Sequence, residues 1–436
     1  MKLWKIQSIP LLDLAALILI IGHLLGGIIS TVSIVFISFL AFFYFTIAKK
    51  INVFSVFLLL VPNILFELLS IYPNENNLLL GNFNNVIFLG SFSISSKFLL
   101  ALAVPMRLLL SNNKSSRAKS SLFLYYIILC IAIICLFYAY FIGIKNPSGL
   151  TVGLRSALSL GVLFLPNIFD DKFYHSLNKI FLLSIILISL NFVNGHWMFI
   201  VYGFIPFILV YIRPKIFVFL ILFLSINLFY NLDNTITILL LASFSFLIII
   251  INKLNIKLLS SKLLFLSLLT IPFVSTLFVL LIKSDGIYDF ETLSGFARFK
   301  LLGDRKPIWD SSWKLIQCSN LFYSLPGSVL EVYFDFRDKT VDWPEGSHNI
   351  ILELPRNISI FASLFFFITI SIDFIRIHKR ATSKINLIIL FCFLNVFIFY
   401  GLTGNSLVYD GVGFLFWLIF ASFKFQVFKD CECNQY

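Results

Sequence analysis

The sequence predicts an all-α protein, a polytopic bundle of 12–14 transmembrane helices with one large loop that contains short helices. Three observations predict this fold. The 436 residues are 59% hydrophobic and only 12% charged, whereas a soluble domain contains about 25% charged residues. The apolar residues gather in runs close to the ~20 residues that a helix needs to cross a bilayer. In lipid every backbone polar group must be paired within the protein, so an open chain can span the membrane only as a helix. The basic residues lie in short clusters between these runs.

The apolar runs give the predicted spans in order. They cover residues 11–29, 31–48, 52–72, 85–110, 122–144, 150–169, 180–195, 196–212, 216–230, 235–251, 263–283, 358–375, 386–403 and 406–423. The runs 196–212 and 216–230 are short and could form paired half-helices, so 12 spans are as reasonable as 14. The first run is long enough to span, and we interpret it as an uncleaved helix rather than a signal peptide.

The placement of charge predicts the orientation of the helices. The net charge is +12, but the Lys and Arg residues are concentrated in every second loop between the spans. This is the positive-inside pattern of membrane proteins. It does not indicate a nucleic-acid partner. Both termini are expected on the basic, cytoplasmic side and the large loop on the opposite side. We therefore divide the chain into N-terminal spans (1–283), the loop (284–349), and C-terminal spans with a cytoplasmic tail (350–436).

Few cysteines or charged residues suggest chemistry within the spans. The six cysteines form no disulfide framework, because they are scattered through apolar runs, the loop and the tail. Polar residues inside spans are costly and therefore informative. Those in or near predicted spans are Asp13, His23, Glu67, Lys97, Arg107, Arg155 and His196. Each could be a buried pair or a snorkelling side chain, and Arg155 shares its predicted level with the large loop.

The first distinctive stretch of the loop is "GDRKPIWDSSWKLIQ". Pro307 suits the first turn of a helix, and Trp309, Trp313 and Ile316 would then share one face. This apolar face predicts a helix lying on the membrane surface, with Arg305 just before it at headgroup height. An ordinary amphipathic helix with a solvated arginine is the alternative.

The second stretch, "DWPEGSHNIILELPRN", directly precedes a span. Ser347 is a possible helix cap, and Asn349, Glu353 and Arg356 are spaced to share one face. Pro355 is expected to break or kink the helix. His348 carries the side chain best suited to moving a proton near neutral pH, although a surface histidine at a loop–helix junction is the simpler interpretation.

These two stretches together resemble the O-antigen ligase and polymerase superfamily of bacterial inner-membrane proteins. The resemblance rests on Arg305 four residues before Trp309, followed later by His348-Asn349 and Leu352, and it covers mainly residues 298–375. It implies a periplasmic loop and a substrate in which oligosaccharide repeats are linked to undecaprenyl diphosphate. A Gly-Ser-Arg element common in the family is absent, and His196 stands at the comparable place.

The resemblance implies a glycosyltransferase that needs no cofactor and no metal. His348 would be the base and Arg305 would stabilise charge on the diphosphate. The expected substrate-binding residues are Arg298, Arg155, Asn349, Glu353, Arg356 and His196. A metal site at Asp335 and Asp338 is a weaker alternative.

We expect a polymerase of repeat units, because the ligase-like Gly-Ser-Arg element is absent. The alternatives are an O-antigen ligase that transfers polymer to lipid A–core and, in another class, a lipid-glycan flippase or transporter. Expected partners are the lipid-linked donor and acceptor, membrane lipids and a chain-length regulator protein, with no nucleic acid.

Overall fold

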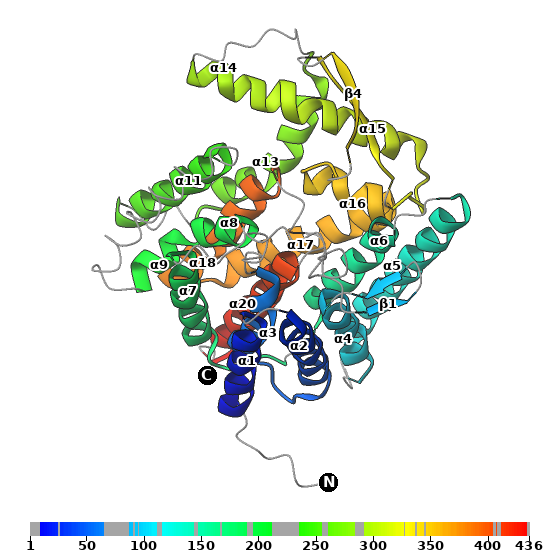
Figure 1. Ribbon diagram of the computed structural model, residues 1–436. Helices are drawn as coiled ribbons and strands as arrows, with labels where there is room; N and C mark the ends of the chain where they lie inside the picture. Colours follow the sequence, from blue (N-terminus) through cyan, green and yellow to red (C-terminus); the bar gives the residue numbers. More distant parts are fainter. Residues whose placement is uncertain are drawn as a thin grey trace. The chain divides into compact units, whose positions relative to one another are not determined.

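The computed structural model shows a predominantly helical protein, with two short antiparallel hairpins in the part of the chain that it describes (Figure 1). This helical content confirms the expected all-α class. The described residues are 9–24, 27–64, 87–89, 92–94, 96–110, 116–143, 147–165, 168–189, 195–211, 235–254, 260–283, 292–326, 328–335, 338–343, 346–403, 407 and 411–433.

The chain divides into two compact units, each assembled from separate stretches. Unit 1 comprises residues 1–125, 158–198 and 410–426, and unit 2 comprises 126–157, 199–409 and 427–436. In unit 1, α2 packs against α4, and α1 packs against α2 and α3. Its elements are α1 (Ile9–Leu24), α2 (Gly27–Ile47), α3 (Val53–Ile64), β1 (Ile87–Leu89), β2 (Phe92–Ile94), α4 (Ser96–Leu110), η3 (Gly161–Phe164), α7 (Phe173–Ser189) and most of α20 (Gly411–Cys433).

Unit 2 contains the large loop and the helices on either side of it. Within it, α18 packs against α9 and α11, while α13 contacts α15, α16 and α17. Its elements include most of α5 (Ser116–Phe141), α6 (Pro147–Leu160) and α8 (Gly195–Gly203), then α9 (Ile205–Tyr211), α11 (Thr235–Leu254), α13 (Lys262–Leu281), α14 (Leu293–Arg298), η5 (Phe299–Arg305), α15 (Lys306–Cys318), β3 (Leu330–Phe334), β4 (Lys339–Trp343), α16 (Ile350–Ile358), α17 (Ile360–Arg380), α18 (Lys384–Asn395) and η7 (Val396–Tyr400).

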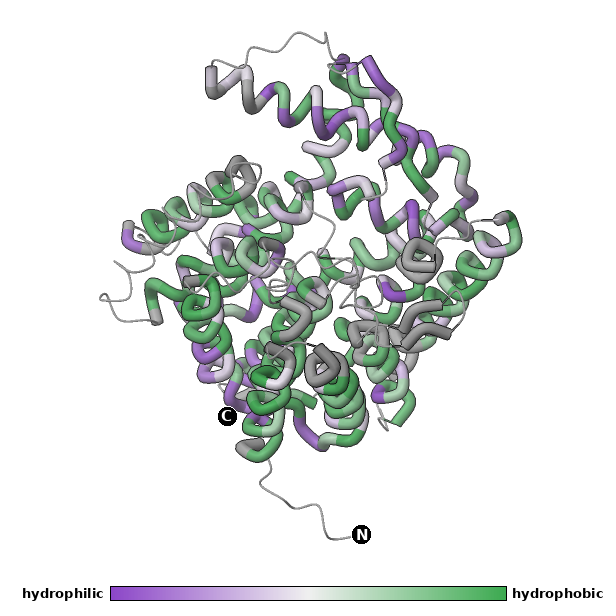
Figure 2. The backbone as a smooth tube through the Cα atoms, viewed as in Figure 1, coloured by the Kyte–Doolittle hydropathy of each residue, from purple (hydrophilic) through white to green (hydrophobic). Residues whose placement is uncertain are grey.

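Among the described residues, four helices are long and apolar enough to cross a membrane. They cover Phe123–Phe141, Lys262–Leu281, Ile360–Arg380 and Val412–Cys431. Shorter apolar helices overlap several other predicted spans. They include Leu11–Gly22, Val35–Ile47 and Phe173–Ile188, the last of which begins before its predicted span of 180–195. Figure 2 shows the helices mostly in the green of hydrophobic residues, with more purple in the segment around α15 and β4.

The outward faces of these helices are also apolar. Along α13, five large side chains are more than half exposed: Leu263, Val274, Leu277, Phe278 and Leu281. Contiguous exposed apolar surface of this kind is unusual on a soluble monomer and marks contact with lipid or another partner. The apolar segment of α20 is instead 78% buried inside the protein, as expected for a helix that is apolar on all sides.

One predicted span begins differently in the structure. Residues 85–110 were expected to form a single helix, but Ile87–Leu89 pairs with Phe92–Ile94 as a hairpin before α4 begins at Ser96. Strand pairing satisfies the backbone as a helix would, and hydropathy alone does not separate the two for a short apolar run. The predicted span 216–230 lies outside the described residues.

Two of the polar residues predicted within spans support the fold of unit 1. Arg107 is buried and donates to the carbonyl oxygens of Thr46, Ala48 and Lys49 at the end of α2. A cation is favourable there, because the last carbonyl groups of a helix lack intrahelical partners. Asp13 accepts a hydrogen bond from Ser55 Oγ at 2.6 Å. Both contacts agree with the structural interpretation of these residues.

Candidate functional site

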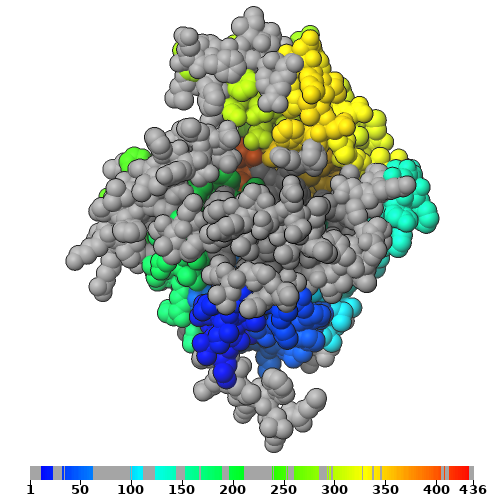
Figure 3. All heavy atoms as spheres, in the orientation of Figure 1, coloured from blue at the N-terminus to red at the C-terminus, as the bar shows by residue number. Residues whose placement is uncertain are grey.

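The loop segment of unit 2 forms a small subdomain with its own hydrophobic core. Strand β3 alternates buried and exposed residues, and it pairs with β4. Ser311 Oγ of α15 donates to the Glu331 carbonyl at 2.6 Å, which fixes β3 beside the helix. Figure 3 shows the atoms of this segment, coloured yellow-green to yellow, closely packed. The core contains Val279, Ile308, Trp309, Ile316, Leu330, Val332, Phe334 and Leu352.

The loop contains the expected short helices, α14 and α15, and in addition the hairpin β3–β4, which was not predicted. The sequences "LEVYF" and "KTVDW" each alternate apolar and polar residues, a period that is typical of half-buried strands. The sequence therefore carries a local signal for this hairpin.

The hairpin also changes the role of the tryptophan face of α15. Pro307 lies in the first turn of this helix, as predicted. Trp309 and Ile316, however, are buried in the subdomain core, and only Trp313 of the three is exposed. The expectation of an indole face lying on the membrane is therefore wrong for Trp309, because the hairpin covers that face.

Arg305 lies at the end of a π-helical turn. Helix α14, the π-helical segment η5 and α15 follow one another without a break, and Arg305 is the last residue of η5. Arg305 is half-buried and Arg298 is exposed. π-Turns within α-helices are rare and frequently occur at functional sites.

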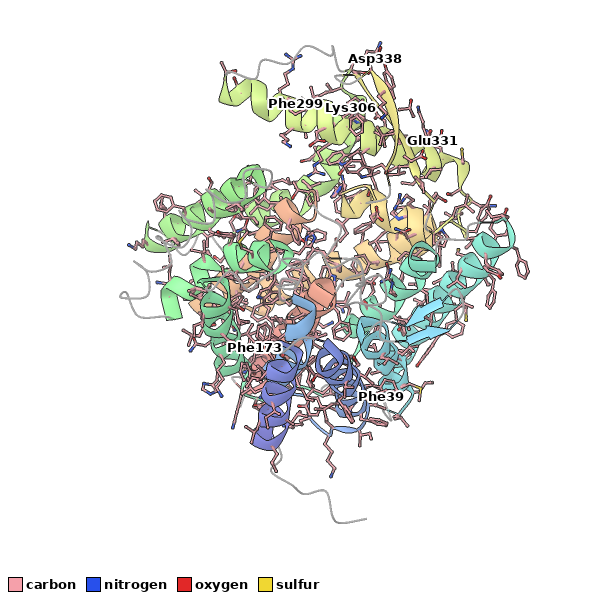
Figure 4. All side chains as sticks on the ribbon, viewed as in Figure 1. Phe39, Phe173, Phe299, Lys306, Glu331 and Asp338 are labelled. Carbon is pink, nitrogen blue, oxygen red and sulfur yellow. The ribbon has the colours of Figure 1, made fainter. Side chains whose placement is uncertain are left out.

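The carboxylates on either side of Arg305 are paired with lysines. Lys300 contacts Asp304 at 3.3 Å, and Lys306 donates to both carboxylate oxygens of Asp310 at 2.9 and 2.8 Å. Figure 4 shows Phe299 and Lys306 along the helix, with Glu331 on the neighbouring strand. The two acids closest to Arg305 in sequence are thus engaged by other cations.

Helix α16 begins with a different cap from the one predicted. Asn349, not Ser347, is the N-cap, and its side-chain oxygen accepts from the Ile351 amide at 2.9 Å. Its side-chain nitrogen donates to Thr276 Oγ1 of α13 at 2.9 Å. The Ile350 amide donates to the Gly401 carbonyl at 2.8 Å. The start of α16 is therefore fixed against two other parts of unit 2.

His348 has an unusual backbone conformation immediately before this cap. Its φ is +51°, in the left-handed region, and Gly346 two residues earlier also has a positive φ. The Trp343 ring meets the imidazole edge-to-face at 5.9 Å between centroids, and Trp343 Nε1 donates to the Gly346 carbonyl at 3.1 Å. A residue with a side chain held in this region is strained, and such strain concentrates at functional sites.

Glu353 connects the segment before α16 to the helix itself. One carboxylate oxygen accepts from the Ser347 amide at 2.6 Å and from Ser347 Oγ at 2.7 Å. The other accepts from Arg356 Nη2 at 2.9 Å and from Asn357 Nδ2 at 2.7 Å. Glu353 is only 1% exposed, and Arg356 is 6% exposed. The predicted shared face of Glu353 and Arg356 is therefore a buried ion pair.

Helix α6 packs directly on the end of α16. A Cβ atom at Gly153 would overlap the backbone carbonyl of Asn357, so only glycine fits this close approach. Arg155, two residues further along α6, is half-buried. Helix α16 continues through Pro355 and ends at Ile358, where Ser359 adopts a φ of +109° and caps α17. The break expected at Pro355 thus lies four residues later.

The remaining predicted residues lie elsewhere or are not described. His196 is exposed at the start of α8, in a stretch that belongs to unit 1. Glu67 and the side chains of His23 and Lys97 lie outside the described residues. The subdomain residues Arg298, Arg305, His348, Asn349, Glu353 and Arg356, with Arg155, all belong to unit 2.

The weaker metal interpretation gains no support from the acids of the hairpin turn. Asp338 accepts a hydrogen bond from Tyr333 at 2.6 Å, which raises the pKa of Tyr333 because the bond stabilises the protonated phenol. Figure 4 labels Asp338 at the turn of the hairpin. Within the part of the chain that the structure describes, no three His, Cys, Asp or Glu side chains group to hold a metal ion.

Comparison with known proteins adds no family assignment. No protein-family model, no curated protein and no solved structure matches this chain. The subdomain combines a strained histidine, an arginine at a π-turn and a buried carboxylate that accepts hydrogen bonds from the residue before that histidine.

Proposed function

We propose that this protein is a glycosyltransferase of the bacterial inner membrane that polymerises oligosaccharide repeats linked to undecaprenyl diphosphate. The reaction takes place on the periplasmic face, inverts the anomeric carbon and requires no metal. Two lines of support come together in unit 2: the sequence resemblance over residues 298–375, and the arrangement of the two stretches that carry it.

The observation that carries this proposal is the placement of His348 and Arg305 around one core. Arg305 precedes Trp309 by four residues, and His348 precedes Leu352 by four residues, while Trp309 and Leu352 pack in the same hydrophobic cluster. Two stretches about forty residues apart in sequence are thereby held in one subdomain. The left-handed backbone of His348 adds a local cost that a purely structural turn would avoid with glycine.

These residue types suit glycosyl transfer from a diphosphate. Departure of the diphosphate builds negative charge that a fixed cation stabilises, and the planar fork of Arg305 can grip two phosphate oxygens. A sugar hydroxyl is a weak nucleophile until a base accepts its proton, and His348 is suited to that role near neutral pH. Direct displacement by this hydroxyl would invert the anomeric carbon.

Aromatic residues support a position of the subdomain at the membrane surface. Tyr138 near the end of α5 contacts Tyr323 at 5.2 Å between ring centroids, and Phe322 contacts Phe361 at the start of α17 at 5.4 Å. Tyr138 and Phe322 are both exposed. Aromatic belts of this kind are typical of the interface, where the diphosphate of a lipid-linked sugar lies.

Deletion of the gene, followed by gel analysis of lipopolysaccharide, tests the function. A polymerase mutant should retain lipid A–core carrying one repeat. A ligase mutant should lose all surface O-antigen and accumulate polymer on undecaprenyl diphosphate. Loss of every periplasmic lipid-linked repeat would instead identify a flippase, and an unchanged gel would contradict the proposal.

Purified protein then tests the chemistry. Added to lipid-linked repeats in detergent with excess EDTA, it should still extend them, because arginines rather than a metal stabilise the charge on the departing diphosphate. Activity that is lost in EDTA and restored by Mg²⁺ or Mn²⁺ would overturn the metal-independent mechanism.

A further inference from the structure

We infer that Glu353 is a positioning residue that acts through His348, rather than a residue that binds the sugar. This inference rests on the proposed function, since it assigns a role within the same site. Its basis is the set of four hydrogen bonds that Glu353 accepts and the backbone segment that two of them hold.

On one side, the Glu353 carboxylate holds the backbone directly before His348. One Glu353 oxygen accepts both the backbone amide and the hydroxyl of Ser347, at 2.6 and 2.7 Å. Ser347 is the residue immediately before His348 and is fully buried. A hydrogen bond to the backbone amide fixes the peptide plane rather than a side chain, so Glu353 restrains the chain directly next to the strained histidine.

The restraint acts from both sides of His348. On the following side, Asn349 is held as the helix cap and by Thr276 of α13 at 2.9 Å. Together with Ser347, this leaves His348 as the single residue between two buried, fixed neighbours. Its half-buried imidazole, met by the Trp343 ring, is therefore held in one place.

On the other side, the Glu353 carboxylate is engaged by residues of its own helix. Its second oxygen accepts from Arg356 and Asn357 at 2.9 and 2.7 Å, so both oxygens already accept two hydrogen bonds each. A residue that is 1% exposed and engaged in this way has little capacity left for a sugar hydroxyl. Arg356 supplies the charge that makes a buried carboxylate tolerable.

A carboxylate is needed because all four partners are donors. Glutamine keeps the shape but offers one acceptor oxygen and one donor nitrogen. With its oxygen turned toward Arg356 and Asn357, its amide nitrogen would face the Ser347 amide, donor against donor. Glu353→Gln therefore releases the segment before His348, while the ion-pair side keeps an acceptor.

A double-mutant cycle tests whether Glu353 acts through His348. Glu353→Gln alone should lower turnover at least 10-fold with donor binding unchanged. In a His348→Ala background, the same change should lower the residual rate less than 2-fold, because the group being positioned is gone. Equal losses in both backgrounds would overturn the positioning role, while slow His348→Ala would still support the proposed function.

Amide hydrogen exchange tests the restraint without any activity. Glu353→Gln should speed exchange in the peptide that contains residues 346–349, and Glu331→Gln, the same change on the exposed face of β3, should not. Ser347→Ala gives a milder test if Glu353→Gln folds poorly. Of the two hydrogen bonds from Ser347 to Glu353, it removes only the one from the hydroxyl and keeps the one from the amide. Unchanged exchange at 346–349 in a folded Glu353→Gln or Ser347→Ala variant would overturn the inference. This result would not depend on whether the proposed function is correct.

Discussion

At the scale of single residues, the backbone of His348 makes a prediction that separates stability from activity. Its φ of +51° costs a residue with a Cβ atom about 1–2 kcal/mol. Glycine avoids that cost but loses about 0.5–1 kcal/mol through extra freedom in the unfolded chain. His348→Gly should therefore be more stable than His348→Ala by about 0.5–1 kcal/mol, although both lack the imidazole and should turn over slowly.

Thermal or denaturant unfolding of the two variants in the same detergent measures this difference. The comparison needs no wild-type reference, because both variants remove the same ring contact with Trp343. A glycine variant that is no more stable than the alanine variant would argue against the left-handed conformation at position 348.

Arg305 makes a second residue-scale prediction. Arg305→Ala should lower turnover about 10²–10³-fold, the usual effect of removing one donor that stabilises a developing anion. Arg305→Lys should fall between the alanine variant and the wild type, because it keeps the charge but loses the two-pronged geometry. Rates with lipid-linked repeats, normalised to protein abundance, provide the measurement.

Lys314 supplies the matched control for this pair. It is an exposed cation on α15, about two turns beyond Arg305, and Lys314→Ala should retain full turnover. If Lys314→Ala lost as much activity as Arg305→Ala, the effect would reflect the general charge of the loop rather than a specific contact with phosphate.

At the scale of elements, the close approach of α6 to α16 predicts a strict size limit. Gly153→Ala would place a methyl group against the Asn357 carbonyl, and overpacking of this kind costs about 1–3 kcal/mol. Because Asn357 also binds Glu353, displacement of α16 should lower turnover as well as stability. Melting temperature and polymer length, measured on the same preparation, would both be reduced; an unchanged variant would mean that the two helices are further apart.

The elements also illustrate which parts of the site could be predicted from sequence. The Arg305–Trp309 spacing can be read directly from the sequence. Local rules also predict Pro307 at a helix start and a short helix before α17. The predicted cap, Ser347, lies two residues before the observed cap, Asn349. Both residue types favour the N-cap position, so the sequence does not separate them. The bond between Ser347 and Glu353 was not predictable, since a carboxylate six residues away reaches back only once Gly346 and His348 turn the chain.

Tertiary packing accounts for the other differences. Trp309 and Trp313 look equivalent on a helical projection, but only Trp309 lies under the β3–β4 hairpin. The π-turn that ends at Arg305 leaves no clear mark on residue periodicity. The burial of Arg356 likewise depends on a segment distant in sequence, because its guanidinium also donates to the Ser328 carbonyl.

At the scale of the whole molecule, the contrast between apolar helices and one polar subdomain was predictable from composition. Most described helices overlap the hydropathy runs, although α7 begins before its predicted span, α20 extends beyond its own and the run 85–110 begins as a hairpin. The division into two compact units was not foreseen, because each unit combines stretches from the beginning, middle and end of the chain. Contacts between stretches so far apart leave no local signal in one sequence.

The orientation of the chain in the membrane can be tested directly. The alternation of basic loops places Lys119, Lys257 and Lys384 in the cytoplasm, and Asn77 and Val341 in the periplasm. Reporter fusions after these residues should give cytoplasmic signals for the three lysines and periplasmic signals for the other two. Val341 is decisive because it belongs to β4, in the same subdomain as Arg305 and His348. Undecaprenyl-diphosphate-linked repeats are polymerised on the periplasmic side, so a cytoplasmic signal at Val341 would overturn both the topology and the proposed site, whereas an error at Asn77 or Lys257 would alter only the number of spans.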